Sequence, residues 1–147
     1  MNKVLPTPLI ILVIVLALIG FADATFLLAE RISGAIIPCF ITTGCDVVSK
    51  SPYSVLFGIP LSAYGMVFYL GIGLLGLLYL DTKNALFARL ILLVTTLDFL
   101  ASAYFIYVQK FLIKAFCIYC ILSAVVSTML FCLGLVIYRK LAVAPTL

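Results

Sequence analysis

The chain has 147 residues, of which 67% are hydrophobic and only 10% are charged, and its mean hydropathy is +1.40. Soluble domains are only about half apolar, so this composition argues against a soluble globular domain and predicts a membrane protein. The net charge of +4 comes from scattered basic residues, which argues against nucleic acid as a partner, and the absence of histidine removes the commonest acid/base group and metal ligand.

The first apolar stretch, residues 8–28, predicts a membrane-spanning helix, because about 20 apolar residues cross the hydrocarbon core. Asp23 lies inside it and is expected to face the protein interior or an interface, since a lone carboxylate is costly in lipid. A signal peptide is the alternative, with Lys3 before the apolar run and Ala22-Asp23-Ala24 as the cleavage sequence. The apolar residues continue past that point, which favours the spanning helix.

A long, more polar loop at residues 30–58 carries Cys39 and Cys45, and loops of this length are usually functional. Three further apolar stretches predict three more spans, at residues 59–80, 86–107 and 116–138. The expected fold is therefore an all-α membrane protein. A single domain, residues 1–147, would form a four-transmembrane-helix bundle with a cysteine-bearing loop between the first two helices.

Four spans put both termini on one side of the membrane and put the loop 30–58 beside the start of the fourth span. Helix parity alone thus brings the pair Cys39 and Cys45 to the same side as the pair Cys117 and Cys120. Five basic residues on the terminal side against four on the cysteine side slightly favour termini in the cytoplasm. Disulfides persist on the oxidising outer side of a membrane, so the cysteine pairs favour the same orientation as the basic residues. We therefore expect a multi-pass protein of the cell membrane with an extracytoplasmic cysteine face.

The spacing of Cys117 and Cys120 puts both sulfurs on one face of a helix, close enough for a disulfide. Cys117 would lie in the first turn, where the helix dipole and Lys114 favour a thiolate. A loop dithiol formed by Cys39 and Cys45 could exchange with this pair by thiolate attack. Taken separately, the helical pair also fits two small buried hydrophobes, and the loop pair also fits a static disulfide.

Zinc is the alternative use of four cysteines, but structural zinc sites usually combine two C-x2-4-C pairs, and the first pair here is spaced C-x5-C, so we expect no metal. Cys132 has no partner in the sequence and is interpreted as a packing residue. A membrane dithiol must pass on two electrons, and the sequence shows neither histidine for haem nor a glycine fingerprint for flavin or nicotinamide. A lipid-soluble quinone docked between helices near Cys120 fits as the acceptor.

Three segments carry a family resemblance: "GFADATFLLAE" in the first span, "PCFITTGCDVVSKSPYSVLFGIPLSAYG" after it, and "CIYC" in the fourth span. Together they resemble the vitamin K epoxide reductase family, in particular prokaryotic homologues that consist of the membrane domain alone. The resemblance covers nearly the whole chain. It implies a four-helix bundle around a quinone such as ubiquinone or menaquinone, with a short helix near residues 47–54. It also implies a thioredoxin-like partner, because many bacterial homologues carry such a domain fused to them. Here we expect that partner to be a separate protein.

The resemblance assigns a role to each of the four cysteines. Cys39 would exchange with the thioredoxin-like partner, and Cys45 would attack the disulfide at Cys117. Cys120 would face the quinone. Ser51 falls where the family has a serine close to the active cysteines.

The quinone-binding groups of the vertebrate enzymes are missing here. An asparagine and a tyrosine hydrogen-bond the quinone in those enzymes, and the matching positions in this chain are about Leu61 and Ala124. Ser62, Tyr104 and Ser123 are candidates to replace them, with ordinary interhelical contacts as the alternative.

The sequence thus predicts a thiol:quinone oxidoreductase that supports disulfide-bond formation. Reduction of a quinone epoxide is an alternative within the same chemistry. A non-catalytic four-helix scaffold or transporter subunit with structural disulfides is an alternative of another class, in which Asp23 and Asp98 would line an ion path.

Overall fold

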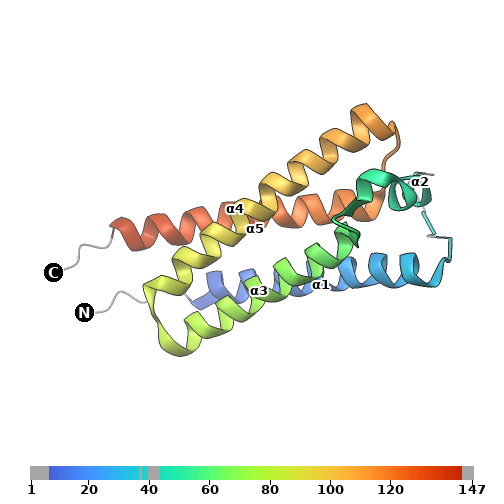
Figure 1. The fold of residues 1–147 in the computed structure, drawn as a ribbon. Coiled ribbons are helices and arrows are strands. Elements are labelled where there is room, and N and C mark those ends of the chain that lie inside the picture. The colour runs from blue at the N-terminus through green and yellow to red at the C-terminus, as the bar shows by residue number, and fades with distance from the viewer. Residues whose placement is uncertain (1–6, 37, 40–43, 144–147) are drawn as a thin grey trace.

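The computed structural model describes residues 7–36, 38–39 and 44–143, and four long antiparallel helices make up most of it (Figure 1). The helices are α1 (Thr7–Ser33), α3 (Leu61–Thr82), α4 (Ala85–Val108) and α5 (Ile118–Val143). Each is long and apolar enough to cross a membrane. The predicted all-α membrane bundle is confirmed.

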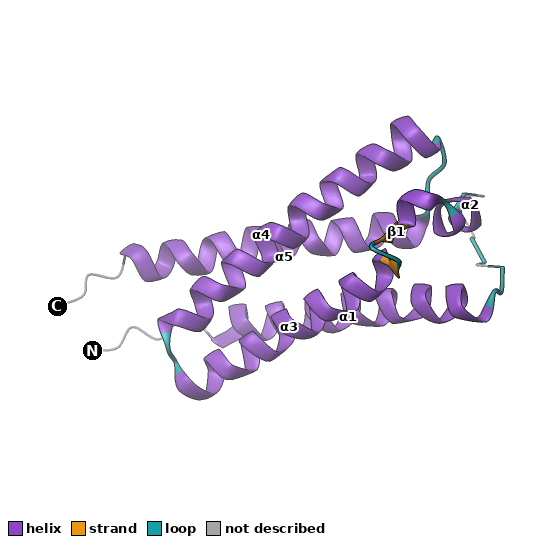
Figure 2. Cartoon of the chain, viewed as in Figure 1, coloured by secondary structure: helices purple, strands orange, loops and turns teal. Residues whose placement is uncertain are grey.

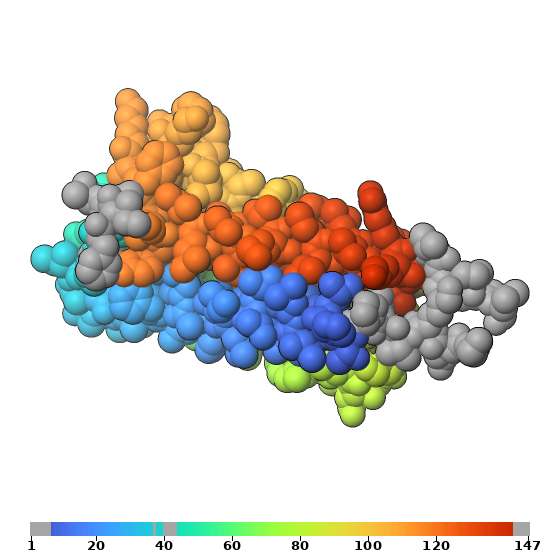
Figure 3. All heavy atoms as spheres, turned by 180° about the vertical axis from the view of Figure 1, so that it is seen from behind, coloured from blue at the N-terminus to red at the C-terminus, as the bar shows by residue number. Residues whose placement is uncertain are grey.

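The helices form a bundle in which α1 packs against α3 and α5, and α4 packs against α3 and α5. Seen from behind, α1 and α5 lie side by side along most of their length (Figure 3). Gly20 of α1 allows one close approach, because a Cβ there would lie 2.5 Å from the ring of Tyr69 on α3. Outward-facing positions such as Leu18, Val67 and Leu100 are exposed apolar side chains, as lipid-facing surfaces require.

A small cap covers one end of the bundle and comes from the segment between α1 and α3 (Figure 2). It contains the short helices α2 (Cys45–Lys50) and η1 (Pro52–Ser54), followed by the two-residue strands β1 (Val55–Leu56) and β2 (Ile59–Pro60). The strands pair antiparallel. The short helix expected in this loop is present, whereas the hairpin has no alternating pattern long enough to predict it.

Helices α3 and α4 are joined by a tight turn and separate from each other toward the cap (Figures 1 and 2). The turn uses Lys83 in the left-handed region, at a φ of 54°, and the side chain of Asn84, whose Oδ1 accepts a hydrogen bond from the N–H of Leu86 at 2.9 Å. At its far end α4 continues into a π-helical turn, η2 (Gln109–Ile113), beyond the predicted limit of the span. Lys114, at a φ of 58°, then turns the chain toward α5.

Candidate functional site

The four cysteines of the two spaced pairs gather under the cap. Cys39 and Cys45 form a disulfide, with their Cα atoms 6.0 Å apart, whereas Cys117 and Cys120 are free thiols. Cys45 and Cys117 are fully buried in one apolar cluster, and Cys39 and Cys120 pack against it. The pairs that are distant in the sequence therefore meet in one place. Cys132, in contrast, is exposed on α5.

Two contacts, one of them a side-chain hydrogen bond, hold the cysteine loop against the start of α5. A Cβ on Gly44 would lie 2.6 Å from the carbonyl oxygen of Phe116 and 2.8 Å from its nitrogen, so the position has room only for glycine. On the other side of the loop disulfide, the Tyr119 hydroxyl donates a hydrogen bond to the carbonyl oxygen of Pro38 at 3.1 Å. Because Gly44 and Phe116 directly precede Cys45 and Cys117, their contact brings those two cysteines together.

Gln109 fixes the backbone of Cys117. Its side chain is fully buried, and its Oε1 accepts a hydrogen bond from the N–H of Cys117 at 3.1 Å. The π-helical turn and the N–H of Ala115, which bonds the Gln109 carbonyl at 3.2 Å, hold Gln109 in this position. An N–H at the start of a helix has no partner within that helix, so Gln109 satisfies a group that would otherwise be buried without one.

Cys117 is activated by its neighbours. The Cys120 thiol donates a hydrogen bond to the Cys117 sulfur, and the N–H groups of Cys120 and Tyr119 add to it, which together lower the pKa of Cys117 from 9.0 to about 7 against the opposing effect of burial. A thiol of this kind is partly thiolate at neutral pH and is also a good leaving group in thiol–disulfide exchange.

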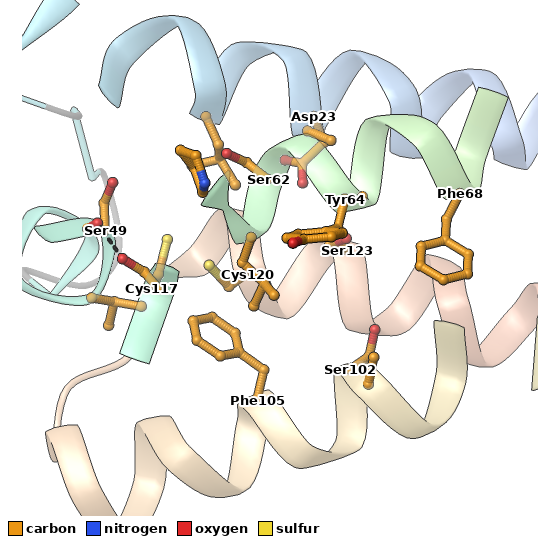
Figure 4. Close-up of a pocket in the computed structure, with 18 of the residues that line it drawn as sticks. Asp23, Ser49, Ser62, Tyr64, Phe68, Ser102, Phe105, Cys117, Cys120 and Ser123 are labelled. Atoms are coloured by element: carbon orange, nitrogen blue, oxygen red, sulfur yellow. Dashed lines mark hydrogen bonds between the residues drawn. The ribbon is translucent and has the colours of Figure 1, made fainter. Parts of the chain in front are cut away.

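Cys120 lines a pocket between the helices, on the side where α3 and α4 separate (Figure 4). The cavity has a volume of about 130 Å³. An apolar protein cavity of about 150 Å³ binds benzene, so this pocket is of the size that takes one six-membered ring. Tyr64 and Phe68 of α3 and Phe105 of α4 supply aromatic walls. Apolar walls with a few polar groups suit a flat, weakly polar ring.

Arg31, at the end of α1, ties the cap to the bundle beside this pocket. Its guanidinium donates hydrogen bonds to the carbonyl oxygen of Ser49 and, at 2.7 Å, to the hydroxyl of Ser54. The Ser54 hydroxyl in turn lies 2.7 Å from the carbonyl oxygens of Ser49 and Ser51. The sequence signal for this role was only a basic residue at the end of a span, followed by a serine-rich loop.

The structure separates the four hydroxyl residues proposed from the sequence into two groups. Ser62 and Ser123 line the pocket with Cys120. Ser51 is half-buried and donates its hydroxyl to the carbonyl oxygen of Val48 at 2.9 Å, and Tyr104 is 64% exposed on α4. Neither Ser51 nor Tyr104 is among the pocket-lining residues. Within the described ranges, no three Cys, Asp or Glu side chains are grouped so that they could hold a metal ion.

Two buried acidic residues, Asp23 and Asp98, also line the pocket. From the sequence alone, both are predicted only to be carboxylates within membrane spans. Asp98 of α4 accepts a hydrogen bond from the Ser127 hydroxyl at 2.6 Å. Asp23 of α1 is only 8% exposed, and its Oδ2 has no hydrogen-bond partner within the described part of the chain. The two carboxyl groups therefore share a pocket but differ in how fully they are bonded.

Comparison with known proteins gives two matches. The sequence matches the vitamin K epoxide reductase family over residues 11–135, a range that contains all four clustered cysteines. It is also 35% identical over 125 residues to a protein of Arabidopsis thaliana named "Thiol-disulfide oxidoreductase LTO1". That alignment covers 76% of this chain and 32% of the relative, so the chain spans about a third of the relative's length.

Proposed function

The chain belongs to the vitamin K epoxide reductase family and is a multi-pass membrane protein, and from this premise we propose that it is a thiol:quinone oxidoreductase that supports disulfide-bond formation. Electrons would pass from a reduced thioredoxin-like partner to the loop pair, then to the pair at the start of α5, and then to a quinone. One observation carries the proposal: the Cys39–Cys45 disulfide packs in the same cluster as two free thiols, and Cys120 lines a ring-sized apolar pocket.

The order of exchange follows from exposure. Cys39 is half-buried at the edge of the cluster, whereas Cys45 is fully buried, so a partner thiolate would attack Cys39 and release the Cys45 thiolate. Cys45 would then attack the sulfur of Cys117 in the Cys117–Cys120 disulfide and release Cys120. The second cysteine of the partner would attack the mixed disulfide between the partner and Cys39, so that the oxidised partner leaves and the Cys39 thiolate becomes free. Attack of Cys39 on Cys45 would finally release Cys117 and restore the loop disulfide.

These exchange steps end with an oxidised loop pair, Cys39 and Cys45, and a reduced inner pair, Cys117 and Cys120. The structure has the same arrangement of one disulfide and two free thiols. The last exchange requires Cys117 to leave, and the lowered pKa of Cys117 makes it the better leaving group. The same hydrogen bond keeps a proton on Cys120 while Cys117 carries the negative charge. The inner pair therefore stores two electrons next to the pocket.

The residues of the pocket fit the single quinone ring of the ubiquinone type, and the second fused ring of a menaquinone would extend beyond the cavity. A quinone accepts two electrons and two protons, and here the Cys117 and Cys120 sulfurs would supply the electrons as their disulfide forms. Tyr64, Phe68 and Phe105 would stack on or enclose the ring and exclude water. Because α3 and α4 supply the aromatic walls of the pocket, an apolar tail would leave between these two helices into lipid.

The proposal also includes an orientation. The cysteine end would face the extracytoplasmic side of a cell membrane, where disulfides persist and thioredoxin-like oxidants operate. The turn between α3 and α4 and both termini would then lie at the cytoplasmic side.

The test is turnover in liposomes that contain the purified protein, a reduced thioredoxin-like protein and ubiquinone-1 or menadione. We expect thiol oxidation that depends on the quinone, and Cys120→Ser is expected to abolish it. Cys39→Ser is expected to block oxidation of the protein partner, while its pre-reduced inner pair still reduces the quinone once. Cys132→Ser is the matched control and keeps full turnover, because Cys132 lies on the outer surface.

Two further measurements separate the alternatives. Wild-type turnover by Cys120→Ser would contradict the proposed path. If the protein carries only structural disulfides, the loop pair resists mild reductant in thiol trapping, whereas a catalytic pair is reduced quickly. A quinone epoxide supplied in place of the quinone tests the epoxide reaction directly.

A further inference from the structure

The two buried carboxyl groups of the pocket are in different bonding states, and the difference points to a ligand. Asp98 belongs to a continuous polar network: its partner Ser127 also bonds the Tyr69 hydroxyl at 3.0 Å and the Ser102 hydroxyl at 3.1 Å. Tyr69 in turn bonds the hydroxyl of Ser123 at 2.7 Å. This network joins α3, α4 and α5, and its polar side chains hydrogen-bond to one another.

Asp23 lies on α1 and has no such partner. Of the three buried side-chain atoms without a hydrogen-bond partner in the described part of the chain, Asp23 Oδ2 is the one that belongs to a pocket-lining residue. Figure 4 shows its carboxyl group extending from α1 toward Ser62, Tyr64 and Ser123. The hydroxyls of Tyr64 and Ser123 are already committed, to the Leu56 carbonyl oxygen at 3.0 Å and to Tyr69. Asp23 therefore faces the cavity with its hydrogen bond unmade.

An unmade hydrogen bond this deep in a bundle costs stability, and an unpaired charge costs more. The neutral carboxylic acid is the form that avoids the charge, and it carries a proton that it can donate. A negative charge on Asp23 would also act on the cysteines, since it raises the pKa of Cys117 and so opposes the thiolate. The inner dithiol and a neutral Asp23 are thus mutually compatible.

We propose that Asp23 is the hydrogen-bond and proton donor to one quinone oxygen, in place of the absent asparagine and tyrosine. This inference rests on the proposed function of the same pocket. Asp23 would hold the ring by donating its carboxylic acid proton to the carbonyl oxygen, and the hydroxyl of Ser62 lies beside it. Asp98 holds the helices together and is not the donor.

The step balances in electrons, protons and charge. Two electrons leave the sulfurs as the Cys117–Cys120 disulfide forms, and both go to the quinone. One proton comes from the Cys120 thiol and the other from Asp23. The negative charge that Cys117 carried before the step is on Asp23 after it. Asp23 then regains a proton from water, which had received one when the Cys117 thiolate formed.

The experiment compares four variants in a single turnover of the pre-reduced protein with ubiquinone-1. Asp23→Asn keeps a hydrogen-bond donor but has no acidic proton, so we expect nearly normal quinone binding and reduction about a hundredfold slower. The solvent deuterium isotope effect should become smaller, because only the exchangeable proton of the Cys120 thiol still contributes to it. Asp23→Leu removes both functions and should also weaken binding. Asp98→Asn is the matched control: it disturbs the hydrogen bond with Ser127 and lowers thermal stability, but the isotope effect remains. Ser62→Ala should weaken binding without changing that isotope effect.

A second readout does not depend on turnover. Infrared difference spectra of the oxidised protein, with and without ubiquinone-1, should show a shift of a carboxylic acid C=O band that is missing in Asp23→Asn and present in Asp98→Asn. A full rate, an unchanged isotope effect and an unchanged band in Asp23→Asn would overturn the inference and leave the proposed function standing. If the wild-type inner pair fails to reduce either ubiquinone-1 or menadione, the proposed function itself is wrong, and the infrared band alone then decides whether Asp23 binds the ring.

Discussion

The two ends of the bundle are built in different ways. In the half that holds the α3–α4 turn, the helices touch directly through fully buried side chains such as Ile72, Ile91 and Leu130. In the half that holds the cysteines, α3 and α4 separate, and a pocket and the cap occupy this end of the bundle (Figures 1 and 4). We call the half with the α3–α4 turn the closed half and the half with the cysteines the open half. The closed half fixes the positions of the helices, so the open half can hold a pocket for a ring while the bundle stays folded.

Different interactions stabilise the two halves. Helices in lipid gain no hydrophobic energy from association and depend on close packing, which small residues permit. Gly134 of α5 shows this in the closed half, because a Cβ there would lie 2.9 Å from the hydroxyl of Thr95 on α4. In the open half, hydrogen bonds from Arg31 position the cap, and one hydrogen bond to Gln109 positions Cys117. Substitutions in the closed half should therefore change stability, and substitutions in the open half should change rates.

The largest expected effect is at Gly44. Gly44→Ala places a methyl group 2.6 Å from the Phe116 carbonyl oxygen, so the loop must move away from the start of α5. A displacement of about 1 Å between reacting groups can cost on the order of a hundredfold in rate, and we expect that loss in exchange between Cys45 and Cys117. Rapid acid quenching followed by thiol trapping measures the exchange directly.

Gly71→Ala is the control for this prediction. Gly71 lies within α3, and a Cβ there meets no atom within 4 Å, so exchange should stay at the wild-type level and stability should not fall. Equal exchange rates in Gly44→Ala and Gly71→Ala would show that the contact with Phe116 does not position the cysteines.

The next effect is a loss of stability in the closed half. Leu130 is fully buried on α5, and Leu130→Ala leaves a cavity that should cost about 2 kcal/mol of unfolding free energy, since lipid removes the transfer contribution but not the packing loss. Its neighbour Met129 is 45% exposed, so Met129→Ala should cost less than about 0.5 kcal/mol. Unfolding in mixed detergent micelles gives both values. Neither variant should slow cysteine exchange, and a slower exchange in Leu130→Ala would mean that the two halves are coupled.

The closed half could be predicted from the sequence more fully than the open half. Length and hydropathy define spans, and the four apolar stretches correspond to the four long helices. The cysteine spacing and helix parity also predicted which residues meet. On α4 the pocket-lining residues Asp98, Ala101, Ser102 and Phe105 follow a helical stripe, and Tyr104 lies off that stripe. Helical periodicity alone could therefore have placed Tyr104 outside the pocket.

The hydrogen bonds of the open half had no sequence signal of that strength. Gln109 reaches Cys117 because α4 continues into a π-helical turn, and no residue pattern in the sequence predicts that turn. Arg31 bonds Ser54 across 23 positions, which depends on how the cap folds back over the bundle. The missing partner of Asp23 is likewise a property of the assembled pocket. Such contacts depend on tertiary structure and become visible only in three dimensions.

Gln109 and Asn84 allow a matched comparison of the two halves. Each side-chain oxygen accepts a hydrogen bond from a backbone N–H at or near the start of a helix, Gln109 from buried Cys117 and Asn84 from exposed Leu86. Gln109→Leu leaves the Cys117 N–H buried without a partner, and we expect exchange at Cys117 about tenfold slower, the equivalent of roughly 1.4 kcal/mol. Asn84→Ala should cost about 1 kcal/mol of stability with no change in exchange rate. Thiol trapping measures the exchange rate and unfolding measures the stability of both variants. A slower exchange in Asn84→Ala, or a normal exchange in Gln109→Leu, would contradict the expected difference between the two halves.

The smallest effect concerns the hydrogen bond that Cys120 donates to Cys117. This bond is the main reason that the pKa of Cys117 is lowered to about 7, so its removal should raise the pKa of Cys117 toward 9 and reduce the thiolate near neutral pH. A bond to a charged group worth about 1.5 kcal/mol corresponds to a thiolate fraction about sevenfold lower at pH 7. In a Cys132→Ala background with the loop disulfide intact, Cys117 is the one thiol left after Cys120 is replaced, and ultraviolet thiolate absorbance reports its titration. Cys120→Ser retains a hydroxyl donor and should titrate at lower pH than Cys120→Ala. Identical titrations of the two variants would assign the activation of Cys117 to the backbone N–H groups at the start of α5 instead.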